Sequence, residues 1–381
     1  MTKTKNLLIK KNENHSKGFS SATARHARKF FKSKYGVRIS FDGCMDGRVY
    51  FSTITGTQAG YIDETFKVAG TKFELGHPYF GKIKEEWCRG NISQGFRSLQ
   101  IISYHFSASH QHLGCKGHGY DTEKARAWTY ALAEQYRFMH DTEGQRFLPV
   151  VVGIETDSCS LVIHGEDPSN TFEVLKYPNA TADEIKEKLF DLFPRAADEL
   201  LAVVTEFILG NQKYIETHSK AVIAKLVNAD HAEQVLVLGR GAEWIFQTTD
   251  EQNDPPLNNF ALWICPVTND YEHHIDVAFD LLVSNFEKGN IDPDDGIVFL
   301  SSGMYGAKEW DPSREHALLK ADFFERVIKD RFKQSKSYEK LLPYVTFLQV
   351  VINRQTRKME IIKEEIAKEI MQVKQELVEA N

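Results

Sequence analysis

The chain has 381 residues, of which 42% are hydrophobic and 26% are charged, and its net charge at pH 7 is −6. These values are typical of a globular protein, and the length favours two domains over a single core. The negative charge gives no reason to expect a nucleic acid partner. No apolar run is long enough for a membrane span. Residues 1–16 are basic and polar, unlike a secretory signal, and predict a short flexible arm.

The cysteines are few and odd in number, which favours free thiols over a disulfide framework. They are Cys44, Cys88, Cys115, Cys159 and Cys265. Without a secretory signal, this count predicts a reducing compartment and hence a cytoplasmic location. Cys159 and Cys265 lie in apolar runs and are predicted to be core residues.

The first half of the chain alternates predicted strands with predicted helices, which is the pattern of an α/β fold. In chain order we expect a basic helix at 21–34, a strand at 37–41 running into Cys44, a short strand or a turn into one at 49–51, and loops over 56–95. A strand at 99–104 should end at His105, and a helix at 123–140 should be capped by Asp121. We then expect a buried strand at 148–154, its hairpin partner at 160–164, and helices at 182–192 and 196–227.

The second half repeats this order more weakly. Strands are predicted at 234–238, 259–266 and 297–300, with a helix at 272–286 before the last of them. No cysteine or histidine pair occupies the matching strand ends, so this half is interpreted as a degenerate internal repeat. The tail from residue 359 repeats apolar residues at steps of three and four, which predicts an amphipathic helix. That helix would dock on its own protein or join subunits.

These elements predict four parts. We expect an N-terminal arm and helix over 1–36, a first domain over 37–228 that holds the candidate site considered next, a degenerate repeat domain over 229–358 and an amphipathic C-terminal helix over 359–381.

Two segments carry the candidate chemistry. The first is Cys44-Met45-Asp46-Gly47-Arg48, and the second runs from His105 to Cys115 and contains three histidines. Two thiols and an imidazole make a Cys2His zinc site, which leaves the fourth coordination position open. Both segments follow predicted strands, and ligands collect beyond the carboxyl ends of parallel strands. The sequence therefore predicts a catalytic zinc centre at one sheet edge.

Three histidines compete to be the third ligand. His105 ends a strand, and strands position ligands more reliably than loops do. His112 forms a compact H-x-x-C with Cys115 and stays as the alternative, while His110 is less well placed. His118 could line the pocket, shuttle protons or be a solvated loop histidine.

Asp46 and Arg48 are the candidate catalytic pair. Zinc lowers the pKa of a bound water toward neutrality and so generates a hydroxide nucleophile. Asp46 could accept a hydrogen bond from that hydroxide and orient it. Arg48 could keep Asp46 ionised and away from the metal. Without that restraint, Asp46 could take the fourth coordination position and close the site.

At these residues the chain resembles the β-class carbonic anhydrases, and most closely the carboxysome shell carbonic anhydrases. Cys44, Asp46 and Arg48 match the C-x-D-x-R motif position by position. Further matching segments are 105–107, 114–115, 118–119, 152–157 and 231–233. The resemblance implies an α/β fold of β-carbonic-anhydrase-like sheets flanked by helices, with an active half and a degenerate half. It also favours His105 over His112, because the zinc histidine of that family precedes the cysteine by a longer gap.

The activity implied is the reversible, Zn2+-dependent hydration of carbon dioxide to bicarbonate and a proton. The implied partners are this small substrate, further copies of the chain in a homo-oligomer, and the carboxysome shell or RuBisCO, with no nucleic acid and no membrane. Two departures are visible: the first catalytic strand begins near Val37, where the family carries a sizeable helical N-terminal region, and Lys116 stands where small residues are usual. The alternatives are a related hydrolase of carbon disulfide or carbonyl sulfide and a catalytically silent, shell-associated scaffold.

Overall fold

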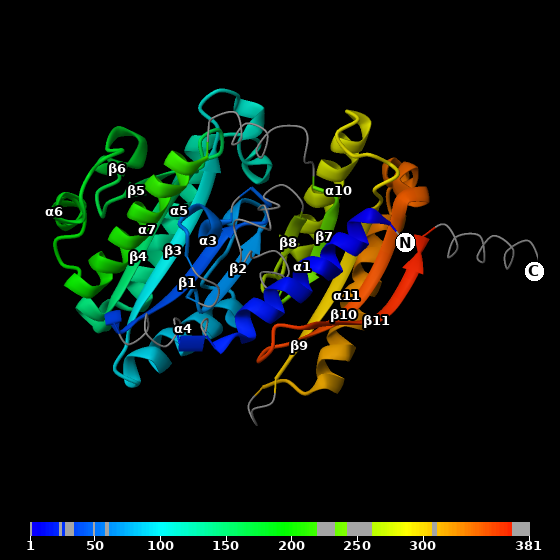
Figure 1. The fold of residues 1–381 in the computed structure, drawn as a ribbon, viewed down its shortest axis with the longest axis horizontal. Coiled ribbons are helices and arrows are strands. Elements are labelled where there is room, and N and C mark those ends of the chain that lie inside the picture. The colour runs from blue at the N-terminus through cyan, green and yellow to red at the C-terminus, as the bar shows by residue number, and fades with distance from the viewer. Residues whose placement is uncertain are drawn as a thin grey trace, which may run out of the picture. The chain divides into compact units, whose positions relative to one another are not determined.

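The computed structural model describes residues 2–22, 25–26, 34–48, 50–57, 61–218, 233–241, 261–306 and 311–367. The chain divides into two compact units, Ala22–Val227 and Met1–Ser21 together with Asn228–Asn381. Each unit is a mostly parallel sheet with helices on its faces (Figure 1). The predicted α/β class is therefore confirmed. Within the part of the chain that the structure describes, no helix combines the length and apolar character needed to cross a membrane.

The first unit is built on a six-stranded sheet in the order β2-β1-β3-β4-β5-β6. Its strands are β1 (Val37–Cys44), β2 (Glu64–Val68), β3 (Arg97–Phe106), β4 (Phe147–Glu155), β5 (Ser160–His164) and β6 (Thr171–Glu173). The first four pair in parallel, and β5 and β6 return antiparallel. Every residue of β4 is buried, which is why its sequence is a nearly continuous apolar run.

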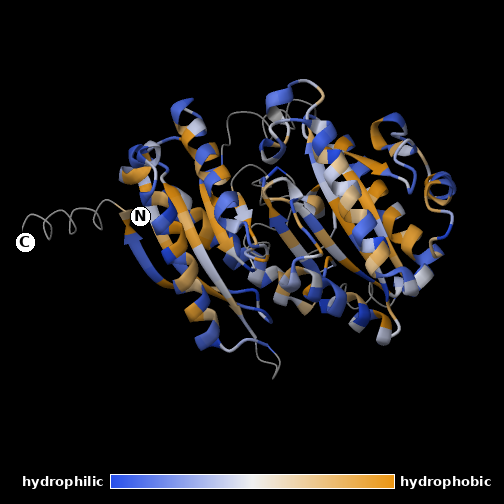
Figure 2. Ribbon diagram, turned by 180° about the vertical axis from the view of Figure 1, so that it is seen from behind, coloured by the Kyte–Doolittle hydropathy of each residue, from blue (hydrophilic) through white to orange (hydrophobic). Residues whose placement is uncertain are grey.

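The helices of this unit cover the sheet with their apolar sides, and Figure 2 shows the hydrophobic colour concentrated in the strands and on one side of the helices. They are α3 (Phe51–Ile54), α4 (Pro78–Ser93), α5 (Thr122–Met139), α6 (Ala182–Leu192) and α7 (Asp198–Thr217). Asp121 caps α5 as predicted, since its side chain accepts a hydrogen bond from the Lys124 N–H at 3.0 Å. The 3₁₀ turns that follow β2 and β3 are η1 (Ala69–Thr71), η2 (Gln111–Leu113) and η3 (Lys116–His118).

The second unit has a five-stranded sheet in the order β11-β10-β9-β7-β8. Its elements are α1 (Lys3–Ser20), β7 (Val235–Gly239), β8 (Ala261–Ile264), α10 (Tyr271–Glu287), β9 (Ile297–Tyr305), α11 (Arg314–Lys333), η6 (Lys336–Tyr344), β10 (Val345–Asn353) and β11 (Met359–Ile366). When β7 to β11 are matched one by one with β1 to β5, the two sheets have the same strand order and the same strand directions. The predicted degenerate repeat is thus visible in the topology.

Strand register shows what the repeat has lost. A Cβ built on Gly43 would lie 3.0 Å from Ser103 Oγ, and one built on Gly239 would lie 2.2 Å from Ser302 Oγ. Aligning these two glycine–serine contacts places Arg240 at the position of Cys44 and Met304 at the position of His105. An arginine and a methionine do not reproduce a thiolate and imidazole ligand set.

The N-terminal prediction was wrong. Residues expected to be a flexible arm form α1, which packs within the second unit against β9 and β11. The Asn12 side chain donates to the Arg357 carbonyl at 2.9 Å and accepts from the Met359 N–H at 2.8 Å. Because this helix docks largely through polar groups, its hydrophobic pattern is weak. Most of the basic helix predicted at 21–34 lies outside the described residues.

The prediction of an amphipathic C-terminal helix was also wrong for the residues that the structure describes. Met359–Ile366 is strand β11, antiparallel to β10 with a bulge at Gln349/Val350. Its glutamates at 360, 364 and 365 form ion pairs with Arg314, Lys5 and Lys329. Charged side chains are typical of an edge strand, and here they interrupt the alternation that marks a strand. Residues 368–381 lie outside the described part.

Two smaller predictions in the first unit were wrong. No strand includes Tyr50 or Phe51, because Phe51 begins helix α3 and Tyr50 is its N-cap. The region expected to be loops, 56–95, contains β2, η1 and α4. The face of α4 turned to the sheet carries the buried Lys84, whose ammonium contacts Asp42 Oδ1 at 2.5 Å, Ser40 Oγ at 2.7 Å and Gln100 Oε1 at 3.2 Å. Because a charged residue lies on the buried face of α4, the sequence does not show the apolar stripe of an amphipathic helix.

This buried ion pair predicts a large stability effect. Lys84 and Asp42 are almost wholly shielded from solvent, and Tyr136 OH also bonds Asp42 at 2.5 Å. Lys84→Met should lower the free energy of unfolding by about 3–5 kcal/mol, because it leaves the Asp42 carboxylate uncompensated. Urea titration followed by circular dichroism measures this. The matched control is Lys82→Met on the same helix, where the exposed Lys82–Glu86 pair should contribute about 1 kcal/mol or less. Equal effects of the two substitutions would contradict the prediction.

Candidate metal centre

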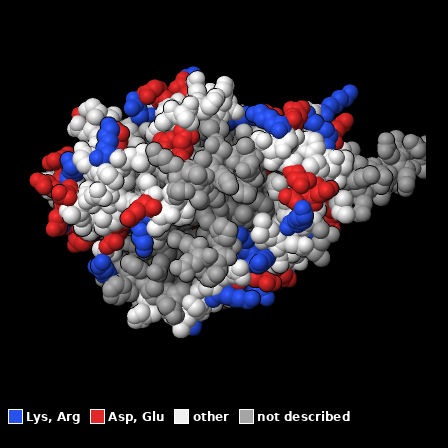
Figure 3. Space-filling view, turned by 45° about the horizontal axis from the view of Figure 1, so that its top comes forward, with Lys and Arg blue, Asp and Glu red and all other residues white. Residues whose placement is uncertain are grey.

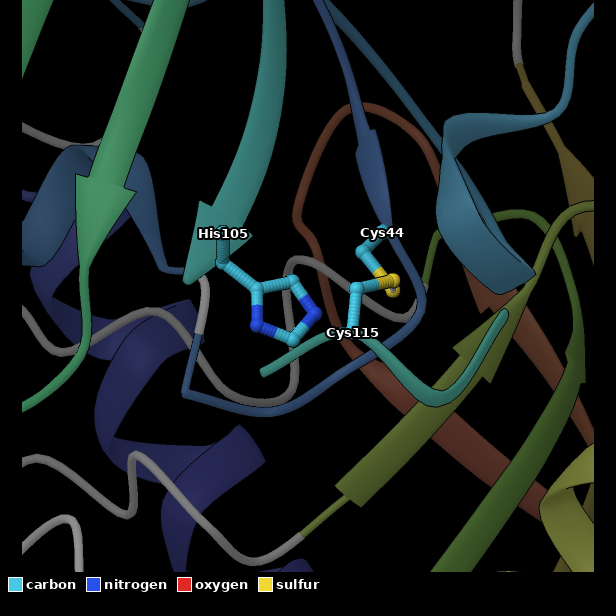
Figure 4. A group of neighbouring side chains, drawn as sticks. All are labelled: Cys44, His105 and Cys115. Carbon is cyan, nitrogen blue, oxygen red and sulfur yellow. Dashed lines mark hydrogen bonds between the residues drawn. The ribbon is translucent and has the colours of Figure 1, made fainter. Parts of the chain in front are cut away.

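Three buried donors converge where β1 and β3 end. Cys44 is the last residue of β1, His105 is the penultimate residue of β3, and Cys115 lies between η2 and η3. Their side chains point toward one another in Figure 4. The two Sγ atoms are 3.8 Å apart, and the donor atoms of all three residues lie within 4.8 Å of one another. The parallel register of β1 and β3 brings together residues that are 61 positions apart in the chain.

This donor set fits a zinc ion. His105 is 1% exposed, yet neither of its ring nitrogens has a hydrogen-bond partner among the described residues. A buried imidazole without a hydrogen bond is unusual unless a ligand satisfies it. Zinc–sulfur distances of about 2.3 Å at a tetrahedral angle require sulfurs about 3.8 Å apart, the spacing seen here. With three protein donors, one coordination position would remain for water or substrate.

A hydrogen bond from the Cys115 thiol lowers the pKa of Cys44 well below that of a free thiol, against the opposing effect of burial. The Gly70 N–H also points to Cys44, 3.3 Å from Sγ. Metal ligation requires the thiolate form of cysteine, so the surroundings already favour the ligating state of Cys44.

Asp46 lies beside the donors and is held by Arg48. Arg48 Nε donates to Asp46 Oδ1 at 3.0 Å and Nη2 donates to Oδ2 at 2.7 Å, while the Arg48 backbone N–H donates to Oδ1 at 2.8 Å. Burial alone would raise the pKa of Asp46, but Arg48 and the neighbouring His105 outweigh it and hold the pKa well below its usual range. Asp46 Oδ2 is 3.7 Å from His105 Nε2. An ionised carboxylate therefore borders the metal position.

The other histidines of the segment do not join this group. His112 and His110 are exposed, and the ring of His112 contacts Tyr120 with centroids 5.2 Å apart. His118 is half-buried, and its Nε2 lies 2.7 Å from the Gly70 carbonyl. Burial lowers the pKa of His118, so the neutral imidazole donates Nε2–H to that carbonyl. Of the remaining cysteines, Cys159 and Cys265 are buried as predicted, and Cys88 is buried in α4, where burial raises its pKa to about 12.

Sequence reasoning gave no role to the acidic turn after β4. Asp157 accepts hydrogen bonds from Ser107 Oγ at 2.9 Å and from the Ser109 N–H at 2.8 Å, and Glu155 accepts one from the Ala108 N–H at 3.2 Å. These carboxylates hold the start of the loop that leads from His105 to Cys115. The available signal was an acidic residue at the end of a fully buried strand, Glu155, and a second one just beyond it, Asp157.

An α/β unit with a Cys2His donor group at parallel strand ends is the arrangement expected of a carbonic anhydrase of the β type. Residues 81–238 match the family model for the carboxysome shell carbonic anhydrase catalytic domain. This match confirms the predicted resemblance. It includes His105 and Cys115, whereas Cys44, Asp46 and Arg48 precede its first residue. No curated protein matches the chain.

The donor group predicts which histidine controls metal content. His105→Ala should reduce bound zinc from about one equivalent per chain to a small fraction, because a two-thiol site lacks its third donor. His112→Ala is the matched control from the same loop and should keep the wild-type content. Elemental analysis after dialysis against a mild chelator measures both. Loss of zinc in His112→Ala with retention in His105→Ala would contradict the assignment.

Proposed function

We propose that the chain is a zinc-dependent carbonic anhydrase that reversibly hydrates carbon dioxide to bicarbonate and a proton. Cys44, His105 and Cys115 hold the zinc in this proposal. The observation that carries it is the buried His105 imidazole without hydrogen-bond partners among the described residues, set between two thiols and an Arg48-bound carboxylate. When bound, zinc supplies the nucleophile by lowering the pKa of a coordinated water.

Asp46 is proposed to orient the attacking group. Because its pKa is far below neutrality, Asp46 remains an acceptor throughout the working pH range and cannot donate a proton. An acceptor beside the reaction position fixes the direction of an O–H bond there and leaves an oxygen lone pair free to face carbon dioxide. Such orientation lowers the entropic part of the barrier.

Arg48 is proposed to keep the site open. Its guanidinium and backbone N–H together engage both carboxylate oxygens of Asp46. Bidentate arginine–carboxylate pairs have a fixed geometry, so they restrain the carboxylate as well as neutralise it. A carboxylate bound in this way is less available to occupy the fourth position of the metal. Lys67 adds a second restraint, since its ammonium donates to the Asp46 backbone carbonyl at 3.0 Å.

The family match also supports a carboxysomal location and association with the carboxysome shell. We therefore include both in the proposal. Within it, the chain's substrate is dissolved carbon dioxide or bicarbonate.

Stopped-flow hydration of carbon dioxide tests the activity directly. Zinc-loaded wild-type protein should accelerate the reaction far above the buffer rate, and Cys44→Ala should not, because it removes a ligand. A zinc-loaded protein that hydrates carbon dioxide only at the uncatalysed rate would overturn the proposal. Turnover of carbon disulfide or carbonyl sulfide by that same protein would then identify a hydrolase.

The role of Asp46 predicts a separation of metal binding from turnover. Asp46→Asn should retain zinc but lose about 100-fold or more in kcat, because the amide can no longer act as an acceptor-only group. Asp63→Asn is the matched control, since Asp63 forms another arginine pair in the same unit, with Arg38 at 3.1 Å. Wild-type turnover in Asp46→Asn would show that the carboxylate has no part in the reaction.

A further inference from the structure

We propose that the turn η1, through Gly70 and Thr71, and the side chain of His118 are positioning residues for the metal centre. Each of the three donor-bearing segments is tied to this one turn by a separate contact. The inference deepens the proposed function and rests on its metal site. Neither residue of the turn belongs to the donor group or to the Asp46–Arg48 pair.

The first contact orients the Cys44 side chain. The Gly70 N–H lies 3.3 Å from Cys44 Sγ and donates a hydrogen bond to it. A backbone donor on a thiolate fixes the orientation of the sulfur lone pairs and removes some of its negative charge. Outer hydrogen bonds of this kind tune both ligand orientation and metal affinity.

The second contact fixes the segment of Cys115. The Gly70 carbonyl accepts the Nε2–H of His118 at 2.7 Å, and η3, which ends at His118, begins directly after Cys115. The two turns approach so closely that only glycine fits: a Cβ on Gly117 would lie 2.6 Å from the Gly70 nitrogen. His118 thus connects the two thiol ligands through a single residue, Gly70.

The third contact reaches the strand of His105. Thr71 is fully buried, and its Oγ1 donates to the Ser103 carbonyl at 2.6 Å. Ser103 lies two residues before His105 on β3. This bond therefore joins the turn to the strand end that carries the imidazole.

The backbone of the turn shows that these contacts are costly to maintain. Gly70 and Thr71 both have left-handed conformations, with φ of 66° and 56°. Glycine accepts this conformation, but a β-branched residue there is a genuine outlier. Such strain persists where the surrounding structure imposes it, and it clusters at functional sites. Glycine at position 71 would relieve the strain but would lose the hydroxyl that reaches β3.

Zinc affinity tests the inference, measured on the full chain by competition with a chromophoric chelator. Thr71→Val keeps the side-chain shape and removes the bond to Ser103, and His118→Leu removes the bond to Gly70. Each should weaken zinc binding by about 10–100-fold, the usual effect of removing an outer-shell partner. Thr71→Ser should restore wild-type affinity. The matched control is Thr205→Val in α7, which removes a buried hydroxyl bond to the Leu201 carbonyl and should leave zinc affinity unchanged.

A second readout separates positioning from loss of stability. In Co2+-substituted protein, the thiolate-to-cobalt absorption bands should shift in Thr71→Val and His118→Leu and remain at the wild-type position in Thr205→Val. If Thr71→Val does not fold, the half-exposed His118→Leu decides the question alone. Zinc affinities within twofold of wild type, with unchanged cobalt bands, would overturn the inference.

The outcome is distinguishable from failure of the proposed activity. A wild-type protein that binds zinc but does not hydrate carbon dioxide would refute the activity, while the affinities of the variants would still decide the inference. A wild-type protein that binds no zinc would refute both.

Discussion

The site depends on the parallel pairing of β1 with β3. That register brings the last residue of one strand and the penultimate residue of the other to one sheet edge, where Cys44 and His105 face each other. The imidazole and the two thiols are shielded from water there, and buried polar groups need bonding partners. A metal ion satisfies all three donors at once. The Asp46–Arg48 pair and the η1 turn are then the groups that surround the three donors and the proposed metal.

The two units share a topology but differ in the residues at the ends of their strands. Both use the same order of strands, and both place a glycine–serine contact where the first and third strands of the repeat run side by side. Only the first carries donors at the matching positions, because the second has Arg240 and Met304 there.

On the face shown in Figure 3, the described Lys and Arg residues lie among Asp and Glu residues. The proposed substrate, carbon dioxide, is small and neutral and needs no single-sign field for its capture.

Much of the candidate site could be predicted from sequence because its candidate ligands follow clear patterns. The strand that positions Cys44 alternates apolar and polar residues, and the strand that positions His105 is built around Leu99, Ile101 and Ile102. Helix α5 has an explicit cap at Asp121, so local signals and tertiary structure agree in these elements. Prediction failed where polar groups do the packing: α1 docks through Asn12, α4 buries Lys84, and β11 pairs its glutamates. The role of Thr71 was invisible because backbone strain leaves no signature in a single sequence.

In the proposed enzyme, Cys44, His105 and Cys115 form a three-donor zinc site with one position open. X-ray absorption at the zinc K-edge, on protein loaded with one equivalent of zinc, tests it most directly. We expect two sulfur neighbours at about 2.3 Å and two lighter neighbours, nitrogen and oxygen, at about 2.0–2.1 Å. One of the lighter neighbours should be exchangeable with added anion. A closed shell with two sulfurs and two imidazoles, unaffected by anions, or a shell without sulfur, would contradict it.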